Sequence, residues 1–447
     1  MTTTRTRFQP IFSSPTSRHS LGSGLGRLAL SAACAASLLS AAACTRPTVG
    51  YCAVDENCDP GQFCSLPAQQ CTSATVIRGV FSGGQTVPPT ASIAEGSFMM
   101  VVSADSQSGT YKLTHTVAQA SKMELFIGKV GQVGSLARSI PLATSGTLEL
   151  DPDTVRALLV GDYYLQISSA TFPLGEVRAQ LFSDNPDATH DVVTLHGALS
   201  GLQSSPSDTS PATGTAEMTL DETNDVVNYK FSYSGLQGTV SGIHVHRGGF
   251  NNNGVHIFDL PATTDTTVAS SIAFGDIVRQ VSDPTLYLAQ RHLWRILLKS
   301  GMSYLNIHST AFTKGEIRAQ MLTTAARPFN LPLRRADGSM GAQGEGQFYL
   351  SADETMLAFR LSHNVSSPTS AVIAKGTAGN RVELTCTALT ASGGTDTAQG
   401  YCPVDAVAGA GIDITALKNG ELTLIIKSAA MPAGEIEGTI KVPPPAT

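Results

Sequence analysis

Three histidines lie within thirteen residues of the stretch SGIHVHRGGFNNNGVHIFDL, residues 241–260. His244 and His246 are separated by one residue, so in a β-strand both imidazoles lie on the same face. In the later segment YLNIHS, the same alternation places His308 on one face with Asn306. If the two strands are neighbours, these three imidazoles converge, and His256 is a fourth candidate ligand. Imidazole nitrogen suits copper and zinc, so one interpretation of the pattern is a site for one of these ions.

A structural interpretation of the same histidines needs no metal, because imidazoles also form hydrogen bonds with backbone carbonyls and hydroxyls. From the sequence alone we favour this interpretation, which requires no cofactor, and keep copper or zinc binding as the alternative. The pattern GIHVH is also similar to the copper-ligand strand of Cu/Zn superoxide dismutase. The ordered further histidines of that enzyme and its metal-bridging aspartate are not evident in this sequence, which argues against redox catalysis.

Motifs of other enzyme classes are absent from the sequence. There is no Gly-x-Ser-x-Gly nucleophile elbow, no phosphate-binding Gly-x-x-x-x-Gly-Lys loop, no His-Glu-x-x-His helix and no dinucleotide fingerprint. Acids such as Asp221, Glu222 and Asp225 fall in a hairpin turn, and turn formation explains them. The sequence therefore predicts a protein that is not an enzyme.

The composition is typical of a β-protein with many turns. Of the 447 residues, 14% are charged and 6% are aromatic, while 42 are glycine. Such a composition favours short strands joined by polar turns. The 29 basic and 35 acidic residues form no block of like charge, which argues against nucleic acid as a partner.

The N-terminus has the features of an export signal. Residues 1–43 carry four arginines and no acid, and the apolar run LALSAACAASLLSAAAC is too short to span a membrane stably. LLSAAAC resembles the signal of bacterial lipoproteins, in which the cysteine, here Cys44, becomes the lipid-modified first residue. We expect an exported lipoprotein of the periplasm, outer membrane or cell surface, whose lipid anchor is its only contact with the membrane. Cleavage before Cys34, or an ordinary cleaved signal, is the alternative.

Export determines how the remaining cysteines are interpreted. Four of them lie in a loop-rich patch, residues 44–74, that is too small to bury a core: Cys52, Cys58, Cys64 and Cys71. In an oxidising compartment this set predicts a knob with two disulfides, for which three pairings are open. No pair has the CxxC spacing of a zinc site, and the acids between them fit a solvated turn better than a calcium site. Cys386 and Cys402 form the last pair, and a bridge there stabilises the fold by about 3 kcal/mol.

One unit recurs three times along the chain. A strand, a Gly-Glu turn and a second strand occur at Gly175–Glu176, Gly315–Glu316 and Gly434–Glu435, with spacings of 140 and 119 residues. Each copy is preceded by a helix-like segment and, further upstream, by two strands that flank an acidic turn. These spacings suit whole domains.

The predicted fold class is therefore all-β. We expect three tandem antiparallel β-sandwich domains, each with one short helix, after a small disulfide-rich N-terminal knob. The predicted boundaries are a signal peptide over residues 1–43, the knob over 44–74, and sandwiches over 75–183, 190–323 and 327–442. In the second sandwich, RHLWRILLKSG predicts an amphipathic helix with Ile296 and Leu297 packed on the sheet and Arg295 and Lys299 in water.

The segments GEVRAQ and GEIRAQ each place an acid and an arginine two residues apart. Glu176 and Arg178 are therefore expected to share a strand face, as are Glu316 and Arg318. We predict a structural ion pair in both copies, with ligand recognition as the alternative. Glu437 stands in place of the arginine in the third copy, so the pair is not needed everywhere.

The copies also act as internal controls for the histidines. At the positions of His244 and His246 the first copy has LFIGKVG and the third has VIAKGTAG. At the position of His308 they have Ser168 and Ser428. The scaffold therefore forms without imidazoles, which favours a local role for the histidines of the second copy.

The second copy resembles the chordin-type (CHRD) domain. The resemblance is carried by SGLQGTVSGIHVHRGG and GVHIFDL, followed by YLNIHSTAFTKGEIRAQM. The first copy is similar through YYLQISSATFPLGEVRAQL, and the third through GEIEGTI and its hairpin. The resemblance implies a secreted binding or structural module. With the predicted lipoprotein signal and the absence of enzyme motifs, we expect a non-enzymatic module of the cell envelope whose partner is an unidentified protein or envelope component.

Overall fold

A computed structural model describes the chain from residue 62 onward, with gaps. The described residues are 62–65, 70–73, 75–103, 106–183, 192–206, 208, 210–250, 252–263, 266–279, 295–386, 389, 398–405 and 411–445. The predicted signal, Cys44, Cys52 and Cys58 lie outside these residues. Of the predicted knob, a hairpin is described, with β1 (Gln62–Ser65) antiparallel to β2 (Gln70–Ser73) and Cys64 opposite Cys71.

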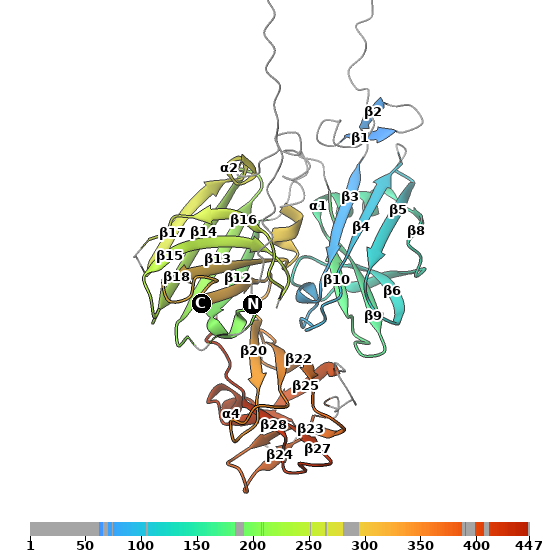
Figure 1. Ribbon diagram of the computed structural model, residues 1–447. Helices are drawn as coiled ribbons and strands as arrows, with labels where there is room; N and C mark the ends of the chain where they lie inside the picture. Colours follow the sequence, from blue (N-terminus) through green and yellow to red (C-terminus); the bar gives the residue numbers. More distant parts are fainter. Residues whose placement is uncertain are drawn as a thin grey trace, which may run out of the picture. The chain divides into compact units, whose positions relative to one another are not determined.

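The first sandwich consists of two antiparallel sheets and one helix (Figure 1). One sheet has the order β11-β3-β4-β5-β8, with β11 at Phe182–Ser183, β3 at Val76–Phe81, β4 at Gly96–Val102, β5 at Ser108–His115 and β8 at Ser145–Glu149. The other has the order β10-β9-β6-β7, with β10 at Val177–Gln180, β9 at Tyr163–Ser169, β6 at Ala120–Ile127 and β7 at Ser135–Ile140. Helix α1 (Pro152–Val160) begins at Asp151, whose side chain caps it, and ends at left-handed Gly161.

The second sandwich is built from one continuous sheet. Its order is β16-β15-β18-β19-β12-β13-β14-β17, and its halves are joined by the pair Ser200–Arg318 and by the isolated bridge His196–Leu322. The first half contains β15 (Val240–Arg247), β16 (His256–Leu260), β18 (Ser303–Ser309) and β19 (Ile317–Met321). The second contains β12 (Val193–Ser200), β13 (Thr213–Asp221), β14 (Val226–Ser234) and β17 (Thr267–Ala273). Buried side chains of both halves form one hydrophobic core, so the sheet folds over on itself.

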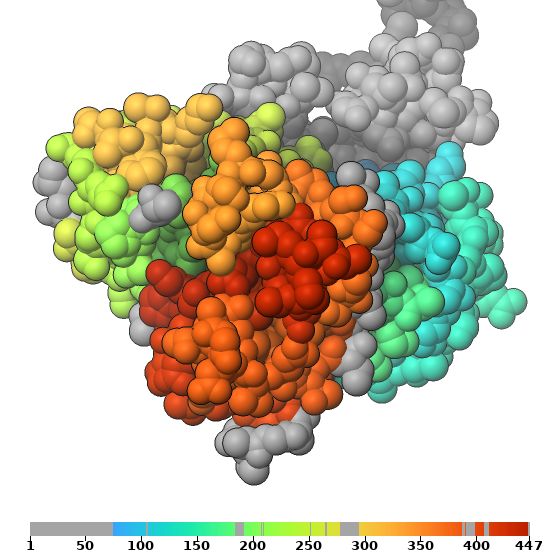
Figure 2. Space-filling model, turned by 60° about the horizontal axis from the view of Figure 1, so that its bottom comes forward, coloured from blue at the N-terminus to red at the C-terminus, as the bar shows by residue number. Residues whose placement is uncertain are grey.

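The third sandwich repeats the two-sheet plan of the first. Its sheets have the orders β20-β21-β22-β25-β26 and β24-β23-β27-β28. Their bounds are Arg327–Leu333 for β20, Gly344–Leu350 for β21, Met356–His363 for β22, Pro368–Lys375 for β23, Val382–Leu384 for β24, Ala398–Asp405 for β25, Ile412–Asp413 for β26, Leu422–Ser428 for β27 and Ile436–Thr439 for β28. Helix α4 (Ile414–Lys418) precedes β27. Figure 2 shows the residues of this sandwich, coloured orange to red, toward the viewer.

The strand order confirms the all-β fold with antiparallel sheets. In each sandwich the same core of strands pairs in the same succession: β7-β6-β9-β10, β16-β15-β18-β19 and β24-β23-β27-β28. Alternation of side chains explains the strands, since in β14 the residues Val227, Tyr229, Phe231 and Tyr233 are buried while Lys230 is exposed. Among the described residues, the parallel pairing of β25 with β26 is a departure from the antiparallel rule.

In the described residues, the second sandwich has two α-helical segments, where one was predicted. They are α2 (Phe274–Arg279) and residues 295–299. Ile296 and Leu297 are buried as predicted. The prediction that Arg295 and Lys299 face water is wrong, because Arg295 is 9% exposed and pairs with Asp225, while Lys299 is 2% exposed and pairs with Glu222. The buried ammonium is retained because a carboxylate lies against it.

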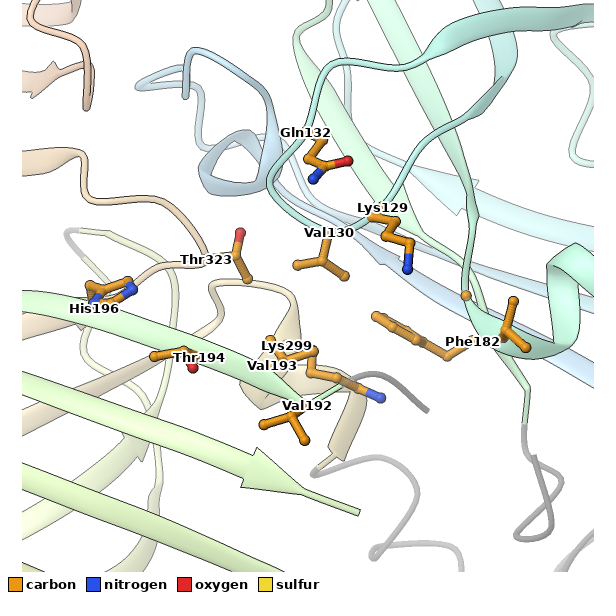
Figure 3. Close-up of a pocket in the computed structure, with 12 residues that line it drawn as sticks. Lys129, Val130, Gln132, Phe182, Val192, Val193, Thr194, His196, Lys299 and Thr323 are labelled. Carbon is orange, nitrogen blue, oxygen red and sulfur yellow. The ribbon is translucent and has the colours of Figure 1, made fainter. Parts of the chain in front are cut away.

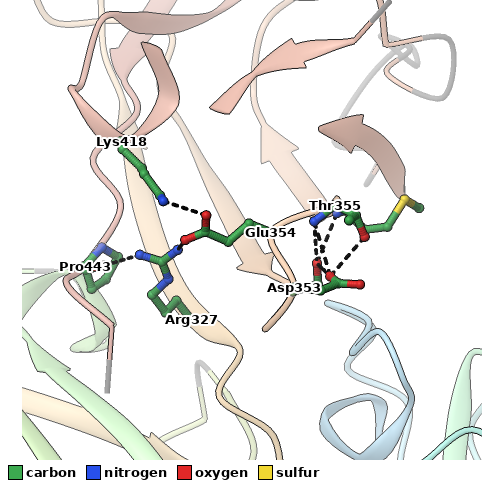
Figure 4. A network of polar contacts seen from close by, with 8 residues as sticks. Arg327, Asp353, Glu354, Thr355, Lys418 and Pro443 are labelled. Carbon is green, nitrogen blue, oxygen red and sulfur yellow. Dashed lines mark hydrogen bonds and ion pairs between the residues drawn. The ribbon is translucent and has the colours of Figure 1, made fainter. Parts of the chain in front are cut away.

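The predicted bridge between Cys386 and Cys402 is confirmed. Cys402 lies in β25 and is fully buried in the core of the third sandwich. An ion-pair network ties the last residues of this sandwich to its strands, with Glu354 between Arg327 and Lys418 (Figure 4). Arg327 also donates through Nη1 to the carbonyl of Pro443 at 3.3 Å.

The ion pairs predicted within GEVRAQ and GEIRAQ are not formed. Glu176 accepts a hydrogen bond from Ser92 Oγ at 2.8 Å, and Glu316 accepts one from Ser210 Oγ at 2.7 Å. The prediction failed because each acid still belongs to the turn: β10 begins at Val177 and β19 at Ile317. The strand alternation therefore does not apply between the acid and the arginine.

The arginines instead hold a loop against the strand that follows the Gly-Glu turn, which is β10 in the first sandwich and β19 in the second. Arg178 donates through Nη1 to the carbonyl of Gln132 at 2.6 Å and through Nη2 to that of Lys129 at 2.8 Å. Arg318 donates through Nη2 to the carbonyl of Gly249 at 2.8 Å. Both guanidinium groups are buried and lie over a tyrosine ring. In the second sandwich, this contact fixes the loop that follows the histidine strand.

The glycine of each Gly-Glu turn has a backbone conformation that other residues rarely adopt. The φ angles are +121° at Gly175, +112° at Gly315 and +140° at Gly434. A Cβ atom at Gly315 would also lie 2.4 Å from the side-chain amide of Asn306. These turns therefore require glycine for both reasons.

Candidate metal centre

The histidine cluster lies on two neighbouring strands, β15 and β18 (Figure 1). The register pairs His244 with Asn306, His246 with Tyr304 and Gly242 with His308. The structure therefore brings His244, His246 and His308 together on one face of the sheet. One ligand atom of each lies within 4.8 Å of the others, and all three side chains are partly buried.

His256 lies beside the cluster and brings a carboxylate with it. Its ring centroid is 5.0 Å from that of His244, and its Nε2 atom is 3.0 Å from Asp259 Oδ1. The same oxygen is 3.4 Å from His244 Nε2. His244, His256 and Asp259 thus form a second group of potential ligands that shares His244 with the first.

The sequence analysis missed Asp259 because strand alternation places it on the opposite face from His256. The pairing shifts between Val245 and His246, so that Val245 faces Phe258 whereas His246 faces His256. This β-bulge leaves Ile257 without a paired residue and changes the phase of the strand by one. Asp259 lies three residues after His256. With a bulge between them, this spacing brings both side chains to the same face of the sheet.

Backbone carbonyls orient two of the imidazoles. Nδ1 of His308 is 3.0 Å from the carbonyl oxygen of Thr313, and Nδ1 of His246 is 3.3 Å from that of Gly254. A carbonyl only accepts, so each Nδ1 donates its proton and each Nε2 carries a lone pair. Metal-bound histidines have this same arrangement, in which the second ring nitrogen donates to a carbonyl or carboxylate.

The Nε2 atoms of these two rings differ in their surroundings. Nε2 of His246 is buried and has no hydrogen-bond partner among the described residues. Nε2 of His308 is 3.2 Å from the side-chain nitrogen of Asn306, which donates to it. A buried nitrogen without a partner costs about 1–3 kcal/mol, and a bound ion would remove this cost.

Burial keeps the imidazoles of His244 and His246 neutral. Desolvation lowers the pKa of His246 to about 4. It also lowers the pKa of His244, with further lowering by His308 and His256 and an opposing effect of Asp259. Neutral imidazole is the form that binds a metal, so near pH 7 neither ring has to lose a proton first.

Gly242 leaves room for the ring of His244. A Cβ atom at this position would lie 2.9 Å from both Cε1 and Nε2 of His244. The equivalent positions of the other sandwiches are Lys122 and Ser370, which both carry side chains. Gly242 is therefore a positioning residue for His244.

His246 occupies a place that an ordinary aromatic residue fills elsewhere. Its ring stacks on Tyr304 with a centroid distance of 5.0 Å and an angle of 5°. In the first sandwich, Phe126 stacks on Tyr164 at 5.0 Å and 6°. The buried arginine also lies over each tyrosine ring. Its Cζ atom is 3.6 Å from the ring centroid for Arg318 and 3.5 Å for Arg178. The two sandwiches therefore share the stack of an aromatic ring, a tyrosine and an arginine, and they differ in that the first ring is an imidazole in the second sandwich.

The register corrects the alignment of the three copies. The first sandwich has Glu124, Phe126 and Ser168 at the positions of His244, His246 and His308. The third has Val372, Ala374 and Lys427 there, so the assignment of Ser428 to the His308 position is wrong by one residue. Lys427 forms an ion pair with Glu383, and Glu124 pairs with Lys122 at 2.8 Å. The other copies use this face for packing and ion pairs.

Comparison with protein families identifies the scaffold. A family model of the CHRD domain matches residues 78–181 and 195–321, which are 231 of the 447 residues. The chain belongs to the CHRD domain family. CHRD domains are binding or structural modules rather than enzymes. The third sandwich shares the strand order of the two matched CHRD domains but lies outside the match. No curated protein matches the chain.

A separate hollow of ≈ 330 Å³ is lined by both CHRD domains (Figure 3). Lys129 and Phe182 of the first domain and His196 and Lys299 of the second contribute to its walls. Lys299 is already paired with Glu222 and lies 3.8 Å from the centre of the Phe182 ring. The hollow therefore gives no second site for chemistry. In the described part of the chain, no helix has the length and apolarity that a membrane span requires.

The lowered pKa of His246 predicts how the metal-free protein responds to acid. An unfolded histidine titrates at 6.5 and the folded one at about 4, so the unfolded state binds more protons between these pH values. We expect stability to be fully present above pH 6.5 and to fall by on the order of 2 kcal/mol toward pH 4. Denaturant unfolding of H246F, which copies the Phe126 arrangement, should show a smaller loss. An equal loss in both proteins would contradict the assignment.

Proposed function

We propose that the second CHRD domain binds one copper or zinc ion through His244, His246 and His308. The observation that carries the proposal is the convergence of three ligand atoms within 4.8 Å from two neighbouring strands. Two ligands of a tetrahedral ion bonded at about 2.1 Å lie about 3.4 Å apart, so the partly exposed rings close on the ion by rotation of the side chains. Asp259 and His256 are available to complete the coordination shell.

Three features support a metal over hydrogen bonding alone. The Nδ1 atoms of His246 and His308 are held by carbonyls, and the buried Nε2 of His246 has no partner in the described residues. Gly242 is a glycine only in the copy that carries the histidines. A role in hydrogen bonding alone explains neither the unused nitrogen nor the space above Gly242.

We also propose that the protein is exported and attached by lipid at Cys44. The N-terminal pattern of residues 1–44 supports this, and the disulfide between Cys386 and Cys402 is expected of an oxidising compartment. In this setting, tandem CHRD domains serve as a non-enzymatic module that binds a protein or another envelope component. Several linked sites on one anchor would strengthen weak contacts through their effective concentration.

The metal site is tested by elemental analysis and calorimetry on the purified mature protein. We expect one copper or zinc ion per chain after loading, and none in H246A. His196→Ala is the matched control, because His196 belongs to the same domain but pairs with Glu217 outside the cluster. Equal metal content in the wild-type protein and H246A, or no metal in either, would refute the proposed site.

Gly242→Ala tests the geometry without removing a ligand. The added methyl group displaces the ring of His244, so we expect the affinity for metal to fall by about 10–100-fold, as for loss of an orienting contact. The fold should be unchanged, since the equivalent positions already carry Lys122 and Ser370. Calorimetry gives the affinity and circular dichroism the fold. Unchanged affinity would show that His244 is not a ligand.

Lipid attachment is tested by replacing Cys44 with alanine in the full-length chain. We expect the wild-type protein to sediment with membranes and to incorporate labelled palmitate, and C44A to lose both properties. Cysteine-to-alanine replacement at Cys34 is the matched control, which should leave both unchanged. A soluble, unlabelled wild-type protein would remove the anchor from the proposal.

A further inference from the structure

A cavity of ≈ 340 Å³ lies within the second CHRD domain, next to the histidine face. Its floor is formed by Tyr304, Asn306 and Arg318 of β18 and β19. Residues 204–206, Asp208 and the turn 311–315 form its walls. Tyr304 also stacks on His246, and Asn306 also contacts His308, so the cavity adjoins the metal site but is lined by different groups.

Polar atoms in this cavity are buried and lack partners. Arg318 is 1% exposed and donates through Nη2 to the carbonyl of Gly249 and to Gln320 Oε1, at 2.8 and 2.9 Å. Its Nε and Nη1 atoms have no partner among the described residues, and neither has Oδ2 of Asp208. Native proteins satisfy nearly all buried polar groups, so these atoms point to a molecule that completes them.

In the first CHRD domain, the counterparts of Arg318 and Asp208 form hydrogen bonds within the chain. Arg178 is the counterpart of Arg318, and its Nη1 donates to the carbonyl of Gln132 at 2.6 Å. Thr90 is the counterpart of Asp208, since both backbone amides donate to the first residue of the preceding 3-10 turn. Thr90 Oγ1 donates to the carbonyl of Glu176 at 2.8 Å. The first domain therefore satisfies with its own chain what the second leaves open.

The open groups define the chemistry of the ligand. A buried guanidinium with an unpartnered N–H group attracts a carboxylate, which accepts a charge-assisted hydrogen bond from it. The carboxylate of Asp208 accepts through Oδ1 from the amide of Ser210 at 2.9 Å, which leaves Oδ2 for a cation. The volume lies at the lower end of the range for small-molecule sites. A small molecule that carries one negative and one positive group matches both Arg318 and Asp208.

We propose that this cavity binds a small zwitterion of the free α-amino acid type, with its carboxylate on the guanidinium of Arg318 and its ammonium group on Oδ2 of Asp208. The assignment goes beyond metal binding and requires no ion. Burial raises the pKa of Asp208, and a bound ammonium group would oppose that rise. Lys314 is exposed at the rim and adds a positive charge there.

The test uses the whole mature protein and the twenty common amino acids as probes. We expect at least one of them to raise the melting temperature and to bind in calorimetry with a Kd below 1 mM, which corresponds to about −4 kcal/mol. Acetate and methylamine each supply half of the ligand and should bind at least about 10-fold more weakly. If none of the amino acids binds, the proposal is overturned.

Two variants locate the binding site. Ala311 is exposed and lines the cavity, so A311W blocks the entrance without disturbing the core and should abolish binding. Thr171→Trp, at the equivalent exposed turn of the first domain, is the matched control and should bind as the wild type does. D208N keeps the acceptor for Ser210 but removes the charge, so it should weaken amino acid binding at least about 10-fold and leave acetate binding unchanged.

The metal-site proposal and the cavity proposal can be refuted independently of each other. We expect H246A, which removes a proposed metal ligand, to retain amino acid binding. Binding that persists in A311W, or that occurs only with metal present, would place the ligand elsewhere and overturn the proposal.

Discussion

The structure depends on a polar contact in each sandwich. This contact holds a loop against the strand that follows the Gly-Glu turn. In both matched CHRD domains a buried guanidinium performs this task, from Arg178 or Arg318, and it lies over a tyrosine on the neighbouring strand. Burying a cation costs free energy unless hydrogen-bond acceptors lie against it, and the loop carbonyls supply acceptors here. The glutamines two residues further along support the same loops, since Gln180 Nε2 and Gln320 Nε2 each donate to backbone carbonyls.

The third sandwich keeps the fastening but reverses its charges. Glu437 occupies the position of the arginine on the last strand, and Arg381 at the end of the loop donates to both of its oxygens, at 2.7 and 3.0 Å. The requirement is therefore a strong polar contact between loop and strand, and either partner can supply the cation. This explains why the sequence of the third copy diverges at this point while its strand order remains.

The sequence predicted the strands and the convergence of three imidazoles, because both follow from alternation within single strands. Alternation failed where the backbone departs from it: at the bulge beside Ile257, which turned Asp259 toward the histidines, and at the turn before β10, which separated Glu176 from Arg178. Lys299 was misplaced for another reason. Its partner, Glu222, is 77 residues away, and contacts of that range are not visible in a local pattern.

The fastened loop also gives the histidine face its particular properties. In the second domain it carries Gly249, whose carbonyl accepts a hydrogen bond from Arg318, and Gly254, whose carbonyl accepts one from Nδ1 of His246. The ring of His246 is thus held from two sides, by a carbonyl and by the stack on Tyr304. An aromatic residue in this place needs only the stack, as Phe126 shows. The extra carbonyl contact aims one nitrogen of the imidazole, and aiming a nitrogen contributes to a ligand site rather than to the stability of a sheet.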